Sequence, residues 1–321
     1  MANNSSAKTI SSEIYAPNRI AQPFNYLSFK IMEKIAETRE TAHIHAKSKP
    51  LNEFINRFAG NWGGVFGVII IAMLVLAALI IPLTTVDPST LNPNESFLPF
   101  FSENHILGTD QLGRDLWAQL WHGLRFSLAI AISAAIIDIV IGVTLGILMG
   151  YFLGVDRVLQ FLIKILSNIP TIIIMILATI VFNPSFFTIV GSLVISGWIG
   201  TANQVRAQVK RAKSLEWVKA SIVLGTPKYK ILRSFIPVII PILITQLVFS
   251  IPGAVLAETG LSFIGLSLPN TATLGSLITS GAQIITLYPR YVLLPSFILI
   301  LFTTSIQLFG NATQDALRRQ R

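Results

Sequence analysis

The stretch WGGVFGVIIIAMLVLAALIIP, residues Trp62–Pro82, contains no charged side chain and decides the class of fold. About 20 consecutive apolar residues are enough for one α-helix to cross the hydrocarbon core of a membrane. The run is continuous and lacks the alternation of apolar and polar residues that is typical of a membrane β-strand. It therefore predicts a transmembrane helix.

Five further runs of the same kind follow along the chain. Hydrophobic residues make up 52% of the 321 residues and charged residues only 12%, which is more apolar than a soluble core of this size needs. The sequence therefore predicts an all-α, polytopic membrane protein with six transmembrane helices. The other five expected spans are Phe126–Tyr151, Ile165–Phe182, Phe187–Asn203, Ile236–Ala257 and Tyr291–Phe309.

A seventh apolar run, Ala272–Tyr288, is shorter and is interrupted by polar residues and glycine. A seventh span would also carry the three C-terminal arginines across the membrane, against the tendency of basic residues to stay on the cytoplasmic side. We therefore expect this run to be a re-entrant or interfacial segment. The interrupting residues are Ser276, Ser280, Gly281 and Gln283.

The distribution of basic residues predicts the orientation in the membrane. If both termini are cytoplasmic, 21 of the 24 Lys and Arg residues lie on the inner side, and only Arg114, Arg125 and Arg290 lie outside. The expected organisation is a cytoplasmic N-terminal tail over residues 1–60, a six-helix transmembrane domain over 61–310 and a cytoplasmic C-terminal tail over 311–321. Within the domain we expect an extracytoplasmic segment over 83–125 and a cytoplasmic loop over 204–235.

The same charge distribution excludes some functions. The net charge of +9 is spread over the inner segments and is not gathered in one soluble domain, so nucleic-acid binding is not expected. The chain has no cysteine, which excludes disulfides and thiolate metal sites. In the N-terminal tail, Phe24, Leu27, Ile31 and Ile35 share one face of a possible helix that would lie on membrane lipids. A floppy tail, or one docked on a partner, is the alternative.

One basic inner segment is SLEWVKASIVLGTPKYKILRS, residues Ser214–Ser234. Ser214 can cap a helix that starts at Leu215, and Gly225 can end that helix in the left-handed conformation. Thr226 and Pro227 would then be the cap and the first residue of a second helix that leads into the fifth span. The first helix has only about ten residues, so it must pack on something to be stable.

This segment resembles the "EAA" coupling motif of permease subunits of ABC importers, whose short helix inserts into a groove on a cytoplasmic ATPase. The motif's alanine-rich helix, glycine and apolar-proline element occur as Lys219-Ala220-Ser221, Gly225 and Ile236-Pro237. Lys219 stands where the motif usually has an acid, so the contact made from that position stays open. An ordinary basic loop that serves orientation alone is the alternative. The resemblance implies an ATPase-coupling role for Glu216, Trp217, Lys219, Ala220, Ser221, Gly225, Thr226 and Pro227.

A second stretch, GTDQLGRD at residues 108–115, resembles the G-T-D-x-x-G-R-D signature of one permease subunit in peptide and nickel importers. AETGLSFIGLSLP, residues Ala257–Pro269, is similar to the segment after the fifth span of that family. Asp110 and Arg114 have the i,i+4 spacing of an ion pair on an outer helix that feeds the second span. That helix would anchor the chain or contact a binding protein. The signature residues are Gly108, Thr109, Asp110, Gly113, Arg114 and Asp115.

The resemblance implies the pore-forming permease subunit of an ATP-driven peptide importer in the cell membrane of a bacterium, working by alternating access. Its implied partners are a second, homologous permease subunit, two cytoplasmic ATPases, an extracytoplasmic substrate-binding protein and the peptide itself. No phosphate-binding loop occurs and all four histidines lie outside the spans, so no catalytic residue, metal or cofactor is expected in this chain. ATP and Mg²⁺ are expected in the ATPases. A nickel or other peptide-like cargo and, in another class, a stand-alone secondary transporter are the alternatives.

Two acidic residues in or at the end of a span are candidates for a pore or gate. Asp138 lies in the middle of the second span, where a carboxylate is costly and should face protein or water. A polar role in the pore and a packing role hydrogen-bonded to Ser133, Thr144 or a partner subunit are both open. Glu258 lies near the outer end of the fifth span, where we expect partial hydration and an outer-gate or pore-mouth role.

Glycines recur every four residues at positions 142, 146, 150 and 154, along and just beyond the second span. A helix face without side chains lets another helix approach closely. The repeat therefore predicts a tight helix–helix contact.

Overall fold

The structure is a computed structural model that describes residues 50–102, 105–269 and 271–317. The chain divides into two units, residues 1–53 and 54–321, and the apolar helices belong to the second. The helix expected around residues 24–35 lies outside the described residues.

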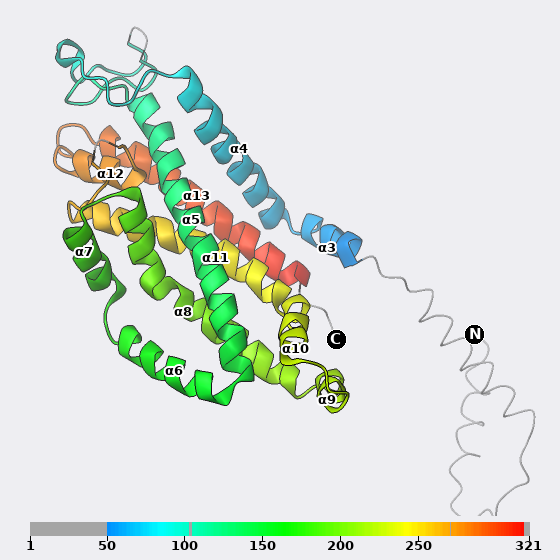
Figure 1. The fold of residues 1–321 in the computed structure, drawn as a ribbon. Helices are drawn as coiled ribbons and strands as arrows, with labels where there is room; N and C mark the ends of the chain where they lie inside the picture. Colours follow the sequence, from blue (N-terminus) through cyan, green and yellow to red (C-terminus); the bar gives the residue numbers. More distant parts are fainter. Residues whose placement is uncertain (1–49, 103–104, 270, 318–321) are drawn as a thin grey trace, which may run out of the picture. The chain divides into compact units, whose positions relative to one another are not determined.

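Long apolar helices make up most of this unit (Figure 1), so the prediction of an all-α, polytopic membrane protein is confirmed. Five helices are long and apolar enough to cross a membrane, and a bent pair of shorter helices makes a sixth span if the pair is counted as one. The five are α4 (Trp62–Thr84), α5 (Leu116–Tyr151), α8 (Phe186–Lys213), α11 (Ile236–Phe263) and α13 (Arg290–Leu317). Because α13 continues to Leu317, the first residues of the expected C-terminal tail are helical.

The expected third span is broken. Its residues belong to α6 (Leu153–Ser167) and α7 (Thr171–Phe182), which meet at an angle of 83°. Pro170 precedes α7, and a proline disfavours a helical conformation in the residue before it, so one continuous helix is interrupted there. At about 1.5 Å per residue, the 12 residues of α7 are too short to cross a membrane core of about 30 Å alone.

The expected seventh run forms only the nine-residue helix α12 (Leu274–Ala282). A capping box between Thr273 and Ser276 starts α12, because each side chain accepts a hydrogen bond from the backbone N–H of the other. A helix of this length cannot span a membrane, in agreement with the prediction of a short segment at this place.

The most extensive helix–helix contact in the unit joins α5 to α8. A Cβ on Gly142, Gly146 or Gly150 would come within 3 Å of Thr201, Val205 or Val209 on α8. The glycine repeat therefore makes the predicted close contact at three of its four positions. Gly154 has no heavy atom within 4 Å of a Cβ, because α5 ends at Tyr151 and Gly154 belongs to α6.

The connections lie at the two ends of these helices (Figure 1). The segment between α4 and α5 lies at one end together with α12, which we call the loop end. The short helices α9 (Glu216–Val223) and α10 (Lys228–Ser234) lie at the opposite end, which we call the α9 end. A 3-10 helix, η1 (Pro93–Glu95), lies in the segment between α4 and α5. The helix α3 (Pro50–Ala59) crosses the boundary of the two units, and its Phe58 contacts Phe309 of α13.

Candidate functional site

The α9 end differs from the expected loop in where its helices begin. The first ten residues of the expected loop over 204–235 continue α8, which ends at Lys213. The prediction that Ser214 caps the next helix is wrong: its hydroxyl donates a hydrogen bond to the carbonyl of Arg211, and Leu215 precedes α9 without a side-chain cap. Pro227, rather than Thr226, is the residue before α10, and no side chain caps that helix either.

The turn after α9 is the one that the sequence predicts. Gly225 has φ +73°, the left-handed region that glycine adopts without steric cost. The Gly225 N–H donates to the carbonyl of Ile222, and the Thr226 N–H donates to that of Ser221, each at 3.0 Å. These two bonds form a Schellman motif, which ends α9 sharply after eight residues.

Only part of the apolar surface of α9 packs within this chain. Val218 is buried in a cluster with Val209 of α8 and Ile231 of α10, and the Trp217 ring lies 5.9 Å from the Phe235 ring. Phe235 is the single residue between α10 and α11. Trp217 is still 38% exposed despite its contact with Phe235. Four further exposed apolar side chains lie on and beside α9, and we call them the α9 crest: Leu215, Ile222, Val223 and Leu224.

Other residues of the coupling motif are accessible. Glu216, Lys219 and Ala220 are exposed, and the half-buried Ser221 donates its hydroxyl proton to the carbonyl of Trp217 at 2.7 Å. The α9 end thus presents a short, rigidly turned helix whose exposed surface is partly apolar.

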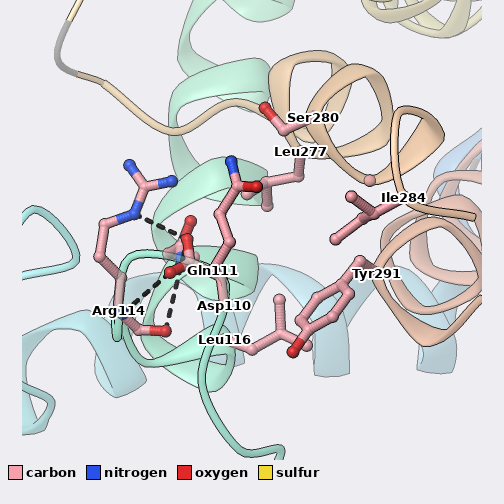
Figure 2. Close-up of a pocket in the computed structure, with 10 residues that line it drawn as sticks. Asp110, Gln111, Arg114, Leu116, Leu277, Ser280, Ile284 and Tyr291 are labelled. Atoms are coloured by element: carbon pink, nitrogen blue, oxygen red, sulfur yellow. Dashed lines mark hydrogen bonds and ion pairs between the residues drawn. The ribbon is translucent and has the colours of Figure 1, made fainter. Parts of the chain in front are cut away.

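At the loop end, residues 108–115 do not form the expected helix. They form a compact turn, and α5 begins at Leu116 after it. The ion pair of Asp110 and Arg114 is confirmed at 2.7 Å (Figure 2). The two residues lie in a loop, however, and not in the helix that their i,i+4 spacing suggested. The Asp110 carboxylate also accepts hydrogen bonds from the backbone N–H of Leu112 and Arg114 and from the amide of Gln119. Asp110 therefore organises the turn.

Each of the other signature residues also has a place in this turn. Gly108 and Gly113 have φ of +74° and +72°, and a Cβ on either would collide with a backbone carbonyl of the preceding segment. Thr109 donates to the carbonyl of Glu95 and accepts from the N–H of Leu98. Asp115 caps α5 by accepting from the N–H groups of Trp117 and Ala118.

Two residues that the sequence analysis did not single out fix this turn to α13. Arg290 donates to the carbonyl of Leu98 at 2.7 Å, and the Tyr291 hydroxyl donates to the carbonyl of Thr109. Arg290 also lies over the ring of Phe100, 5.1 Å from its centroid. The sequence held one signal for this contact: Arg290 is one of only three basic residues expected on the outer side.

We expect Asp110→Ala to destabilise the turn between α4 and α5. The substitution leaves the Arg114 guanidinium without its carboxylate partner and removes one of the two acceptors of the buried Gln119 amide, at a cost of about 2–4 kcal/mol. The loss would be measured as faster limited proteolysis between the two helices. Gln111→Ala, an exposed neighbour, is the control. Equal cleavage rates for the two variants would contradict the central role of Asp110.

Asp138 is buried and faces protein. It packs against Gly197 of α8, where a Cβ would collide with its carboxylate. One of its oxygens, Oδ1, has no hydrogen-bond partner within the described residues. The expected partner Thr144 donates instead to the carbonyl of Val140, and no bond to Ser133 is present in that part of the chain. α8 therefore packs against Asp138 but offers no hydrogen-bond partner to its Oδ1 within the described residues.

Glu258 is only 1% exposed, so the expectation of partial hydration is wrong. Its carboxylate accepts from the hydroxyls of Ser127 in α5 and Ser262 in α11. Ser127 in turn accepts from the N–H of Leu274, the first residue of α12. α12 covers the acid, and Glu258 therefore joins three helices at the loop end.

A cavity of about 1060 Å³ opens at the loop end beside this junction. Its lining is mixed and includes Asp87, Arg114, Gln119, His122 and Ser280. Hydrogen bonds from the side chain and backbone of Ser89 lower the pKa of Asp87, which keeps this carboxylate charged. By contrast, the pocket of Figure 2 holds only about 30 Å³, room for about one water molecule.

Comparison with known proteins gives the family. Residues 142–320 match the model of the "Binding-protein-dependent transport system inner membrane component", and residues 49–99 match that of the "N-terminal TM domain of oligopeptide transport permease C". The oligopeptide transport system permease protein OppC of Bacillus subtilis is 32% identical over 265 residues, covering 81% of this chain and 87% of that protein.

Two further relatives extend the match. OppC of Haemophilus influenzae is 30% identical over 303 residues, covering 92% of this chain and 96% of its own. The dipeptide transport system permease protein DppC of Bacillus subtilis is 33% identical over 220 residues, covering 67% and 69%. With its apolar helices and these matches, the chain belongs to the family of binding-protein-dependent transport system inner membrane components, multi-pass proteins of the bacterial plasma membrane.

Proposed function

We propose that the chain is the pore-forming permease subunit of an ATP-driven ABC importer for peptides. The observation that carries this proposal is the α9 crest, an apolar surface left open on a short helix at one end of the unit. An exposed apolar surface of this kind is typical of a protein contact. The names of the relatives, which are oligopeptide and dipeptide permeases, favour peptide as the cargo.

The α9 end faces the cytoplasm in this proposal, because the positive-inside tendency favours that side for its many basic residues. Two cytoplasmic ATPases, which bind ATP and Mg²⁺, would dock there, one of them on the α9 crest. Movement of α9 would pass through Val218 and Trp217 to Phe235 and so directly to α10 and α11. Coupling would therefore use the packed side of α9 for transmission and its exposed side for docking.

The loop end would face the outside, where a substrate-binding protein delivers peptide to this chain and a second permease subunit. The large cavity at this end has room for a short peptide. Its lining carries a negative charge at Asp87 and a positive charge at Arg114. Glu258 is a candidate for the outer gate because it links α5, α11 and α12. Asp138 remains a candidate for a polar role in the pore or for packing against α8. This chain itself carries out no covalent chemistry in the proposed cycle, which switches access between the two sides.

Purification of the complex from bacterial membranes, followed by reconstitution in liposomes, tests this function. We expect an ATPase to co-purify and uptake of labelled oligopeptide to require both ATP and the substrate-binding protein. Uptake by this chain alone, without ATP, would instead identify a secondary transporter. Transport of a nickel chelate but of no peptide would show that the proposed cargo is wrong.

A further inference from the structure

A strip of small and polar residues lies at least partly exposed where α8 and α11 contact each other. On each helix its members are three or four residues apart and therefore share one face. A Cβ on Gly200 of α8 would lie 3.9 Å from Nε2 of Gln246 of α11, so the two faces adjoin. We call this set the amide strip, and its members are Gly197, Gly200, Gln204, Gln246, Ser250 and Gly253.

The amide strip reaches into the middle of the spans. Gln246 is ten residues into α11, about 15 Å along its axis and so about half-way through a membrane core of about 30 Å. Its side-chain amide is only half-buried and forms no hydrogen bond within the described residues. Because an amide without a partner is costly in hydrocarbon, this strip does not face the lipid chains.

The exposed face of α4 has a different chemistry. It carries the large apolar side chains of Ile69, Met73, Leu76 and Ile80, each more than half exposed. Such a surface suits the acyl chains of a membrane. The amide strip instead combines glycines and a serine with two glutamines, so the two surfaces require different surroundings.

A buried acid points toward one end of the amide strip. Asp138 of α5 is 8% exposed, and a Cβ on Gly197 would collide with its carboxylate. Its Oδ1 has no hydrogen-bond partner within the described residues. Buried polar atoms in proteins nearly always have a partner, so a donor from outside this part of the chain is expected here.

Two kinds of neighbour could cover the amide strip. Glycines allow a second helix to approach closely, but the main-chain groups of a helix are already paired with one another. An extended peptide has free N–H and C=O groups, and a glutamine amide can both donate to and accept from such groups. The strip therefore fits a peptide in a polar pathway better than it fits a packed helix.

We propose that the amide strip lines the cargo pathway and that Gln204 and Gln246 form hydrogen bonds with the main chain of the passing peptide. All peptides share these main-chain groups, so contacts of this kind do not depend on the cargo's side chains. This inference rests on the proposed function and adds to it the part of the peptide that this chain contacts.

Thiol labelling in the reconstituted complex tests the location of the strip, because the chain has no cysteine of its own. During ATP-driven turnover we expect Gly200→Cys and Gly253→Cys to react with a charged, membrane-impermeant methanethiosulfonate. Saturating oligopeptide should slow both reactions. The controls Met73→Cys and Leu76→Cys on α4 should stay unlabelled.

Two results of this labelling would overturn the proposal. One is a strip as unreactive as the controls on α4. The other is crosslinking of the thiol of Gly253→Cys to the second permease subunit without any labelling by the soluble reagent, which would identify a protein interface.

Uptake measurements test the main-chain contacts. The double variant Gln204→Leu with Gln246→Leu removes both amides and nearly keeps the side-chain size. We expect uptake to fall about tenfold, by the same factor for an alanine peptide and a lysine peptide, because the lost hydrogen bonds involve only the main chain. Gln283→Leu, an exposed amide at the end of α12, is the control and should transport normally.

The unchanged protein separates this inference from the proposed function. Peptide uptake by the unchanged complex tests the function itself, and co-purification of the ATPase shows whether the double variant is assembled. If the unchanged complex transports peptide and the assembled double variant transports it equally fast, only the role of the two amides is wrong.

Discussion

The double variant Val223→Asp with Leu224→Asp should lower the affinity of this chain for its ATPase partner at least about 100-fold and abolish ATP-driven uptake. The two side chains are 86% and 82% exposed, so the substitution removes little packing from the chain itself. Burial of each in a partner's groove is worth about 1.5–3 kcal/mol, and about 2.7 kcal/mol corresponds to a 100-fold change in affinity. An unpaired carboxylate carried into an apolar groove adds a further desolvation cost.

The matched control places two carboxylates at the other end of the unit. Leu91 and Phe101 are also exposed apolar residues, and they lie in the segment between α4 and α5. Leu91→Asp with Phe101→Asp should leave ATPase binding unchanged, as measured by co-purification and by titration of the ATPase into nanodiscs. If the crest variant binds the ATPase as tightly as this control does, the α9 crest is not the docking surface.

The spans could be predicted from the sequence because membrane insertion depends on local composition. The run at Trp62–Pro82 became α4 with nearly the same bounds. The end of α9 could be predicted for a similar reason, since the left-handed turn at Gly225 is a property of the backbone of one residue. Predictions of this kind need no knowledge of what lies across the helix.

The predictions that failed depended on contacts between distant segments. The signature at residues 108–115 has the spacing of a helix, but its Asp110 satisfies four donors in a turn that Arg290 and Tyr291 hold from α13. The acid at Glu258 looked hydrated from its place in the span, yet α12, a segment beyond the end of α11, covers it. The break at Pro170 had a local signal, the proline itself, but the length of the apolar run favoured one continuous span.

Gly146→Leu should prevent stable folding of the transmembrane unit, because the backbones of α5 and α8 approach each other too closely at Gly146 to leave room for a side chain. A Cβ at this position would lie 2.7 Å from the carbonyl oxygen of Ala202 and 2.7 Å from the Cβ of Val205. Neither atom is at the end of a flexible side chain, so the two helices would have to separate. Inserting a side chain into a packed core typically costs about 1–3 kcal/mol, and the backbone contact places this substitution at or above the upper end.

The measurement is the thermal midpoint of the purified chain in detergent, together with the yield of assembled complex. Gly154→Leu is the control, because it makes the same chemical change in the same four-residue repeat at a site with no heavy atom within 4 Å of a Cβ. Both substitutions improve intrinsic helix propensity, so a difference between them isolates the packing of α5 on α8. A Gly146→Leu protein that is as stable as the Gly154→Leu protein would show that α5 and α8 do not depend on this close approach.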